Sequence, residues 1–384
     1  MNYLEKLLEG VEVEWKPLGE VAELKRGKTI TAKEKTEGSI PVISGGQQPA
    51  YYNAEFNREG ETITVAGSGA YAGFVSYWNK PIFVSDAFSI KPKSSLLITR
   101  YVFHYLLNKQ FQIYNLQKGS GVPHVYPKDL AKLKIPIPPL EIQQKIVEIL
   151  DKFTELTAEL TAELTAREKQ YEYYRNKLLS FSNVNGGGYK RLTMSKLGCF
   201  IRGKRFVKND MIPKGIPCIH YGEMYTHYGV SAEKSKSFVA KELVESKKLR
   251  IADKNDVVIV AAGETIEDLG KGTAWLGEEG VVIHDACFIF KSSLNPKYIA
   301  HFTRTRQFHN QIRRHIRTGK ISSINARGLE KTIIPIPSLK EQERIVSILD
   351  KFDTLTKSIT EGLPKEIELR QKQYEYYRNK LLSF

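Results

Sequence analysis

Cysteine is scarce in this chain, and the few copies argue against several kinds of site. Cys199, Cys218 and Cys287 are the three cysteines among 384 residues, and no two of them have the spacing of a zinc-binding or redox pair. An odd number without paired spacing argues against a disulfide framework and favours a reducing compartment. We therefore expect a cytoplasmic protein with no cysteine-based metal site.

Long apolar segments are also absent. No stretch approaches the roughly 20 apolar residues that a membrane-spanning helix needs. The opening MNYLEKLLEGVEVEW contains acidic residues early and lacks a small-residue cleavage site, so we expect no signal peptide. Hydrophobic residues still make up 41% of the chain, which supports buried cores, and the length suits two or three domains.

Catalytic and metal-binding motifs are missing as well. The eight histidines show no metal-ligand spacing, RGKT at Arg26 lacks the upstream glycine of a phosphate-binding loop, and no adenine-methyltransferase motif occurs. Asp86 and Asp285 recur at matching positions, where structural hydrogen bonding is favoured over acid–base catalysis. His301 and His309 are expected on a basic helix surface. We expect no catalytic residue, no metal site and no cofactor bound by this chain.

Acidic residues are outnumbered by basic ones. The 58 Lys and Arg against 43 Asp and Glu give a formal net charge of +15. No acid occurs between residues 299 and 320, a segment that carries Arg304, Arg306, Arg313, Arg314, Arg317 and Lys320. A charge run is usually a solvated surface, but uncompensated cations in a basic chain favour contact with nucleic-acid phosphates.

The most informative feature that is present is a duplication. REKQYEYYRNKLLSF, residues 167–181, returns as RQKQYEYYRNKLLSF, residues 370–384. IPIPPLEIQQKIVEILDKFTEL, residues 135–156, returns as IPIPSLKEQERIVSILDKFDTL, residues 334–355. Fainter matches precede both segments in the same order, so a unit of about 200 residues occurs twice, which is a domain duplication and not a solenoid. The nearly identical tails suggest that both tails perform one shared task, and the unlike globular segments suggest that each globular domain performs a different one.

Both tails have the apolar spacing of long helices that begin after the proline-rich IPIP. The first seam steps by three and four, as in a coiled coil, through Ile142, Ile146, Ile149, Phe153, Leu156, Leu160, Leu164, Tyr171, Tyr174, Leu178 and Phe181. The second repeats it, but Gly362 and Pro364 predict a break or kink inside it. Its residues are Ile345, Ile348, Phe352, Leu355, Ile359, Leu363, Ile367, Tyr374, Tyr377, Leu381 and Phe384. Because the link SNVNGGGYK is short, the second helix must run back along the first. A dimerising coiled coil between two chains is the alternative.

The globular segments have the pattern of mixed α/β domains. Short β-like runs such as ETITVAGSG and NDVVIVAAG are broken by glycines, and one helix is expected in each domain, at residues 99–117 and 296–317. The polar loops QKGSGVPHVY and RTGKISSIN follow these helices. Unlike loops on like scaffolds suit two readers of different base sequences, although ordinary drift would also produce them. The candidate DNA-binding residues are Lys118, Ser120, His124, Arg304, Arg306, Arg313, Arg314, Arg317, Lys320, Ser322 and Asn325.

This organisation resembles the specificity subunit of type I restriction-modification systems over essentially the whole chain. The repeated IPIPPLEIQQKIVEILD and IPIPSLKEQERIVSILD segments carry the resemblance, together with TAELTAELTA at residues 157–166. It implies an α+β fold in which two long antiparallel helices form an intramolecular coiled coil, pseudo-two-fold and nearly circular. The expected parts are a first target recognition domain (1–134), a central repeated helix (135–182), a linker with the second domain (183–333) and a C-terminal repeated helix (334–384).

The resemblance also implies a function. Each domain would bind one half of a bipartite, asymmetric double-stranded DNA target, and the helices would act as spacers that dock two methyltransferase subunits. S-adenosylmethionine, ATP and Mg would belong to those and to motor-nuclease subunits. Tyr173, Arg175, Tyr376 and Arg378 are the candidate docking residues, since Tyr and Arg are enriched in interfaces, unless some of them pack the helices together. A stand-alone DNA-binding coiled-coil scaffold is the alternative, and a nuclease is disfavoured.

Overall fold

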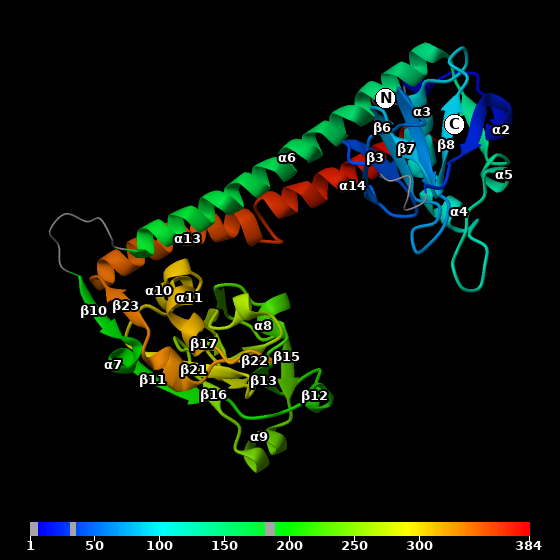
Figure 1. Ribbon diagram of the computed structural model, residues 1–384. Helices are drawn as coiled ribbons and strands as arrows, with labels where there is room; N and C mark the ends of the chain where they lie inside the picture. Colours follow the sequence, from blue (N-terminus) through cyan, green and yellow to red (C-terminus); the bar gives the residue numbers. More distant parts are fainter. Residues whose placement is uncertain (1–6, 31–35, 181–188) are drawn as a thin grey trace. The chain divides into compact units, whose positions relative to one another are not determined.

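The computed structural model describes residues 7–30, 36–180 and 189–384. The chain divides into two compact units, Met1–Leu160 with Glu366–Phe384, and Thr161–Lys365 (Figure 1). Each contains a mixed domain of strands and short helices together with parts of the long helices, which agrees with the expected α+β class. Phe181 of the predicted seam and link residues 182–188 lie outside the described residues. In the described part, no helix is both long and apolar enough to cross a membrane.

The first unit is built on two small sheets. Strands β2 (Ala22–Arg26), β8 (Ala87–Pro92), β5 (Glu61–Ala66) and β6 (Val75–Asn79) pair antiparallel in that order. The second sheet has the order β4 (Tyr51–Asn53), β3 (Ile40–Ile43), β7 (Phe83–Val84), and β3 runs parallel to β7. Helix α3 (Thr99–Asn108) packs on β5, β6 and β8, with α2 (Leu18–Val21) and α5 (Pro127–Leu130) near the sheet end.

The second unit repeats this plan and adds edge strands. Strands β11 (Gly198–Arg202), β21 (Cys287–Ser292), β17 (Val257–Val260) and β19 (Gly272–Trp275) keep the order of the first sheet, followed by β14 (Ser231–Ala232). The other sheet has β15 (Ser237–Val239), β13 (Ile216–Ile219) and β20 (Val281–Ile283), flanked by β12 (Met211–Ile212) and β16 (Ile251–Ala252). The shorter helices are α7 (Met194–Leu197), α8 (Glu223–Thr226), α9 (Lys241–Lys247) and α12 (Ala326–Glu330). The expected duplication is thus confirmed strand by strand.

The single helix expected in each domain is two helices. The segment 99–117 contains α3 and α4 (Gln110–Tyr114), separated at Lys109, and 296–317 contains α10 (Pro296–Phe302) and α11 (Arg306–Ile312), followed by a 3-10 turn, η4 (Arg313–His315). In the second domain the reason is local. The hydroxyl of Thr305 accepts a bond from the backbone N–H of Phe308 and so caps a new helix. The prediction gave the correct first residue of each helical segment, but it was wrong that each segment is one continuous helix.

The IPIP segments are edge strands that precede the tail helices. Strand β9 (Lys134–Ile137) pairs antiparallel with β1 (Glu14–Pro17), and β23 (Ile333–Ile336) pairs with β10 (Lys190–Thr193). Their proline carbonyls bind the domain cores: the Tyr101 hydroxyl donates to Pro136 O at 3.1 Å, and that of Tyr298 to Pro335 O at 2.8 Å. Each tail is therefore tied to its own domain before its helix begins.

Three long helices follow these strands: α6 (Leu140–Ser180), α13 (Leu339–Lys357) and α14 (Leu363–Leu381). The predicted break in the second tail is confirmed between α13 and α14, where Gly362 has a φ of +81°. Pro364 lies in the first turn of α14, where its missing N–H costs no helical hydrogen bond. Ile359, predicted in the seam, falls in the break and is 79% exposed, so that assignment was wrong.

The tail helices pack antiparallel within each unit, as predicted (Figure 1). In the second unit, Glu168 pairs with Lys357, and further along α6 the ring of Tyr174 stacks on Phe352 at 5.6 Å. In the first unit, Phe153 of α6 stacks on Tyr377 of α14 at 5.1 Å, and Leu381 joins the domain core. Both pairings are made within one chain, which favours the intramolecular coiled coil over the dimer.

A buried histidine connects the first domain to both helices. His104 of α3 is fully buried, and its Nε2 lies 2.7 Å from Oδ1 of Asp151 on α6, while its Nδ1 lies 3.0 Å from the Tyr374 hydroxyl on α14. Arg100 donates to the same carboxylate at 2.7 Å. Burial raises the pKa of Asp151, but bonds from His104 and Arg100 outweigh it and bring the pKa below its ordinary value.

The second domain repeats this connection. His301 of α10 is fully buried, with Nε2 3.3 Å from Oδ1 of Asp350 on α13, and Lys297 donates to the other carboxylate oxygen at 2.9 Å. The ring of Tyr171 on α6 meets His301 edge-on, and its hydroxyl donates to Asp353. The expectation that His301 faces a basic surface was therefore wrong, because a carboxylate from the tail draws this side chain inward.

A glutamine at the start of each tail helix completes the junction. Gln143 is buried, accepts from the N–H of Ile98 at 2.9 Å and donates to the carbonyls of Leu96 and Pro138. Gln342 does the same in the second unit, accepting from Asn295 N and donating to Pro337 O. These bonds satisfy backbone groups that would otherwise be buried without partners.

Replacing Gln143 should therefore destabilise the first unit. We expect Gln143→Ala to lower the free energy of unfolding by about 1–3 kcal/mol, because it leaves buried backbone groups unpaired. The adjacent Gln144 is exposed and its side chain donates to Glu148, so Gln144→Ala is the matched control. Equal urea midpoints for the two variants would contradict this.

The buried histidines also predict an acid-sensitive fold. Burial lowers the pKa of both His104 and His301 below 6.5, although the bonded carboxylates oppose this. The unfolded chain then binds more protons, so stability should be complete above pH 6.5 and fall below it, by at most about 1.4 kcal/mol per histidine at pH 5.5. Urea unfolding at pH 7.5 and 5.5 measures this. The double variant His104→Asn, His301→Asn should lose less stability than the natural chain over this interval, and an equal loss would contradict the idea.

Candidate nucleic-acid interface

Each domain carries one exposed loop that closes in the same way. In the first, the backbones of Lys118 and His124 exchange hydrogen bonds of 2.9 and 2.8 Å. In the second, Arg317 and Ser323 exchange bonds of 2.8 and 2.9 Å. Residues 119–123 and 318–322 thus form two equivalent loops, each closed by a single antiparallel bridge that makes a short ribbon. In Figure 1 the first ribbon extends away from the sheets, between α4 and α5.

Both ribbons are anchored to the same end of the domain sheet. After the first, the N–H of Val125 donates to Gly67 O just beyond β5, at 3.0 Å. After the second, the N–H of Ile324 donates to Ala261 O just beyond β17, at 2.8 Å, and β22 (Ser322–Ser323) pairs with β18 (Ala262–Gly263). The loops therefore occupy corresponding positions on two scaffolds.

An Arg-Gly-Lys tripeptide lies at this sheet end in both domains. Arg26 ends β2 and Arg202 ends β11, and both are exposed. The intervening glycines are required, since a Cβ on Gly27 would lie 2.0 Å from Ser85 O, and one on Gly203 would lie 2.2 Å from His284 O.

The two arginines are held by aromatic and backbone partners. The guanidinium of Arg26 lies 5.6 Å from the ring centre of Tyr126, which directly follows the first loop, and Arg202 donates to Asp285 O at 2.9 Å. Sequence reasoning missed these residues because it compared RGKT with a phosphate-binding loop. The signal that would have found them is the recurrence of RGK after the first long strand of each half.

The chemistry beside these shared features differs between the domains. Ser44 and Ser85 follow β3 and β7, whereas the corresponding positions after β13 and β20 hold His220 and His284. The two histidine rings lie 4.6 Å apart, and burial lowers the pKa of each, so they are favoured in the neutral form. One scaffold therefore presents hydroxyl groups where the other presents imidazoles.

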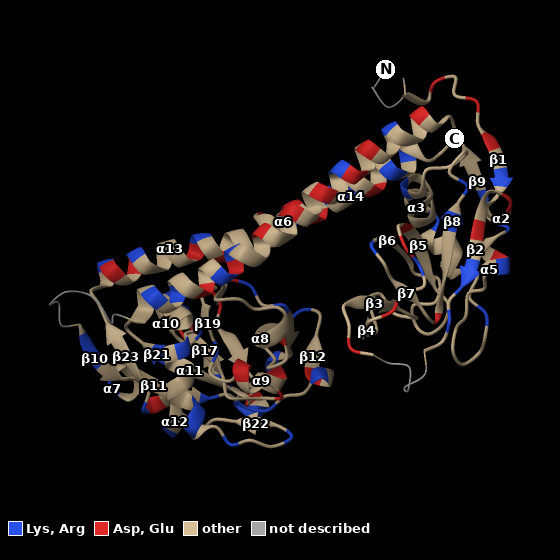
Figure 2. Cartoon of the chain, turned by 45° about the horizontal axis from the view of Figure 1, so that its top comes forward, with Lys and Arg blue, Asp and Glu red and all other residues tan. Residues whose placement is uncertain are grey.

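The structure brings most, but not all, of the predicted DNA-binding residues to the loops. Lys118 and Ser120 are exposed, and His124 stacks on Tyr126 with ring centres 6.0 Å apart. The exposed cations of the second domain near its loop are Arg313, Arg314, Arg317 and Lys320. Figure 2 shows how Lys and Arg are distributed over the cartoon, including α11 and the loop before β22.

The remaining predicted residues have structural partners. Ser322 is buried, and the Asn325 side chain caps α12 by accepting from Gly328 N. Arg306 pairs with Glu172 of α6 at 2.7 Å, and its backbone N–H donates to Asn176. Arg306 and Asn325 are nevertheless exposed, whereas Ser322 is not accessible to a ligand.

Arg304 is half-buried in the second unit. Its Nη2 donates to Gly229 O at 2.7 Å, and burial lowers its pKa to about 10, so it stays charged at neutral pH. The cations between residues 304 and 320 therefore differ in their surroundings. Arg304 bonds the backbone inside the second unit, whereas Arg313, Arg314 and Arg317 face solvent.

The candidate docking residues divide in the same manner. Tyr173 and Tyr376 are 58% and 60% exposed at equivalent places on α6 and α14. Arg175 and Arg378 instead lie over the rings of Tyr171 and Tyr374, 4.1 and 5.0 Å from the ring centres. The two tyrosines face solvent, whereas the two arginines support the packing between helix and domain.

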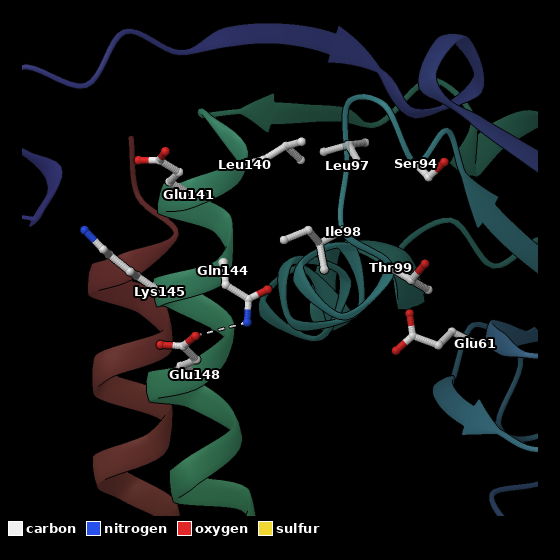
Figure 3. Close-up of a pocket in the computed structure, with 10 residues that line it drawn as sticks. All are labelled: Glu61, Ser94, Leu97, Ile98, Thr99, Leu140, Glu141, Gln144, Lys145 and Glu148. Carbon is white, nitrogen blue, oxygen red and sulfur yellow. Dashed lines mark hydrogen bonds between the residues drawn. The ribbon is translucent and has the colours of Figure 1, made fainter.

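A hollow of about 660 Å³ lies at the start of α6 in the first unit (Figure 3). Glu61, Glu141 and Glu148 line it with Lys145 as the single cation, and Gln144 donates to Glu148 at 3.1 Å. This acidic lining is unsuited to DNA phosphates. No group of His, Cys, Asp and Glu in the described residues could hold a metal ion.

Comparison with known proteins identifies the scaffold. The family model described as "Type I restriction modification DNA specificity domain" matches residues 10–167 and 196–369. The chain belongs to the type I restriction enzyme specificity subunits. It is 35% identical to a putative specificity subunit of Haemophilus influenzae, covering 100% of this chain and 98% of that one. It is also 35% identical to the EcoR124I/EcoR124II specificity subunit of Escherichia coli, covering 100% and 97%.

Solved structures of specificity subunits share the fold. The type I restriction-modification S subunit from M. genitalium matches with a TM-score of 0.59 at 18% identity, over 100% of both chains. A chain from a study of complex assembly and conformational transition of the type I system matches with a TM-score of 0.64 at 16% identity, over 96% of this chain and 97% of that one. The two loop-bearing domains are the DNA-recognition domains of this specificity subunit.

The repeated arginines give a direct test. We expect Arg26→Ala and Arg202→Ala each to weaken binding to non-specific duplex DNA and to reduce the slope of log K against log salt by about 0.9, the value for one lost phosphate contact. Arg191→Ala is the matched control, because Arg191 is exposed in the second domain but lies on β10, in the ladder next to the tail. Fluorescence anisotropy across a salt series measures the slope. A control that changes it as much as Arg202→Ala would contradict the assignment.

Proposed function

We propose that this specificity subunit is a non-catalytic chain whose two domains each bind one half of a bipartite, asymmetric double-stranded DNA target. The observation that carries the proposal is the pair of equivalent loops on equivalent sheet ends with unlike side chains. Shared geometry suits the shared task of approaching a duplex, and unlike loops suit different base sequences. Exposed cations beside each loop supply the attraction to phosphate.

The tail helices act in this proposal as the spacer and as the docking site for two methyltransferase subunits. Two copies of one partner need two equivalent surfaces, and Tyr173 and Tyr376 are exposed at equivalent places in the repeat. Beside Tyr173, a hollow of about 500 Å³ is lined by residues of α6 and α11, which suits the side chain of a partner.

The chemistry of the complex belongs in this proposal to the partner subunits. S-adenosylmethionine would be bound by the methyltransferases, and ATP and Mg by the motor-nuclease subunits, in the cytoplasm. A stand-alone scaffold without methyltransferase partners is the competing function. Co-purification of the tagged chain with a methyltransferase subunit from its own host separates the two functions.

The TAEL repeat gives the sharpest test of the spacer role. Residues 157–166 lie inside the continuous helix α6, and four helical residues add about 6 Å of length. One base pair advances about 3.4 Å. Deleting residues 161–164 should therefore change the unread spacer by one or two base pairs and leave both half-sites as they are. Methylation mapping in cells that express the chain with its partners reads out both quantities.

A length-preserving variant in the same repeat provides the control. Glu159 is exposed on α6, so Glu159→Gln should leave the spacer and both half-sites unchanged. A deletion that alters a half-site sequence, or one that leaves the spacer length as it was, would contradict the spacer role.

A further inference from the structure

Each DNA-recognition loop carries an exposed, β-branched apolar side chain at the same place. Val122 is 56% exposed and lies two positions before His124, which closes the first ribbon. Ile321 is 62% exposed and lies two positions before Ser323, which closes the second. The loops otherwise differ at every position between their closing residues, with GSGVP in one and TGKIS in the other. The apolar position is therefore what the two turns share.

Single exposed apolar residues are common and need no explanation alone. These two differ because they recur at one position of two dissimilar loops and because each loop carries at least one exposed cation, although Lys118 of the first also pairs with Asp129 at 2.7 Å. Lys118 lies at the base of the first ribbon, and Arg317 and Lys320 lie in the second, all exposed. An exposed apolar side chain near cations suits a ligand that presents an apolar group on a polyanion.

The shape of the loops indicates which part of DNA they can reach. The two backbone segments joined by such a bridge lie about 4.8 Å apart. The major groove, about 12 Å wide, admits two paired backbone segments and displays base-edge groups that differ for every base pair, whereas the minor groove, about 6 Å wide, displays no methyl group. The apolar group that bases present in the major groove is the 5-methyl of thymine.

We propose that Val122 and Ile321 each contact the 5-methyl group of a thymine in the major groove, one in each half of the target, and thereby specify that base. The inference rests on the proposed function and adds a residue and a base to it. The loop cations hold the ribbon against the phosphates, and the apolar tip reads the methyl group. Specificity at this position then comes from dispersion and burial and not from a hydrogen bond.

The test uses the natural chain in complex with its methyltransferase partners and duplexes that carry the target mapped by methylation. Each thymine is replaced singly by deoxyuridine, which removes the methyl group and keeps every hydrogen bond. We expect one position in each half-site to lose about fourfold in affinity, the value of burying one such group. If no deoxyuridine position weakens binding, the inference is overturned.

Loop variants assign the effect to its residue. With Val122→Ala the deoxyuridine penalty should disappear in the first half-site and persist in the second, and Ile321→Ala should show the reverse. Ile251→Ala, an exposed isoleucine on β16 outside the loop, should leave both penalties in place. Penalties that persist in the loop variants, or a loss of binding that is equal for all duplexes, would point to a wedge between base pairs and sink the proposal.

Failure of the proposed function has a different signature. A natural complex that yields no bipartite target by methylation mapping would refute the half-site model itself. A bipartite target with deoxyuridine penalties that ignore the loop variants refutes only the thymine contact. Circular dichroism of each variant confirms that it is folded, and the deoxyuridine series on the natural chain needs no variant at all.

Discussion

The buried histidine–carboxylate pairs hold each domain to helices from both halves of the sequence. His104 joins Asp151 and Tyr374, and His301 joins Asp350 beside the ring of Tyr171. Unpaired, such groups would be costly inside a protein, so the helix must be in place for the domain to be stable. This requirement explains the duplicated YEYYRNKLLSF, since each of the two equivalent domains has one surface on which the same helical segment packs. The repeat serves internal packing, and its tyrosines Tyr173 and Tyr376 stay exposed on the helices.

In each domain, the contacts that recur in both halves lie at one end, and the side chains that differ between the halves lie at the loop-bearing end. The tyrosine, glutamine and histidine contacts recur at the junction between each domain and its tail, where a change would disturb the core. At the loop-bearing end, Ser44 and Ser85 in one domain correspond to His220 and His284 in the other, and the ribbons have unlike sequences. Side chains at this end can differ without moving the sheets that carry them. New recognition chemistry can therefore be placed on an unchanged frame.

Periodicity predicted the frame well and its details less well. The tail helices, the break at Gly362 and the matching strand order followed from apolar spacing, proline and repetition, all of which act locally. The partial burial of Arg304 and the full burial of His301 did not follow, because they depend on Gly229 and Asp350, which are distant in sequence. Exposed Tyr173 and half-buried Arg175 are neighbours in one motif, and only the helix packing separates their roles. The pairing of the two tails followed from the repeat, but individual side-chain contacts between distant segments could not be predicted from one sequence.

The first unit is assembled from both ends of the chain. Leu7 near the start and Leu381 and Leu382 near the end lie in one hydrophobic core cluster, whereas the second unit is complete by Lys365. During translation, the second domain can therefore acquire all its parts while the ribosome still holds the last residues of the first. The amino-terminal domain is synthesised earliest, but its hydrophobic core is complete only after α14 has been synthesised. Order of synthesis and order of completion are reversed in this chain, and premature termination would leave the earlier domain unfinished.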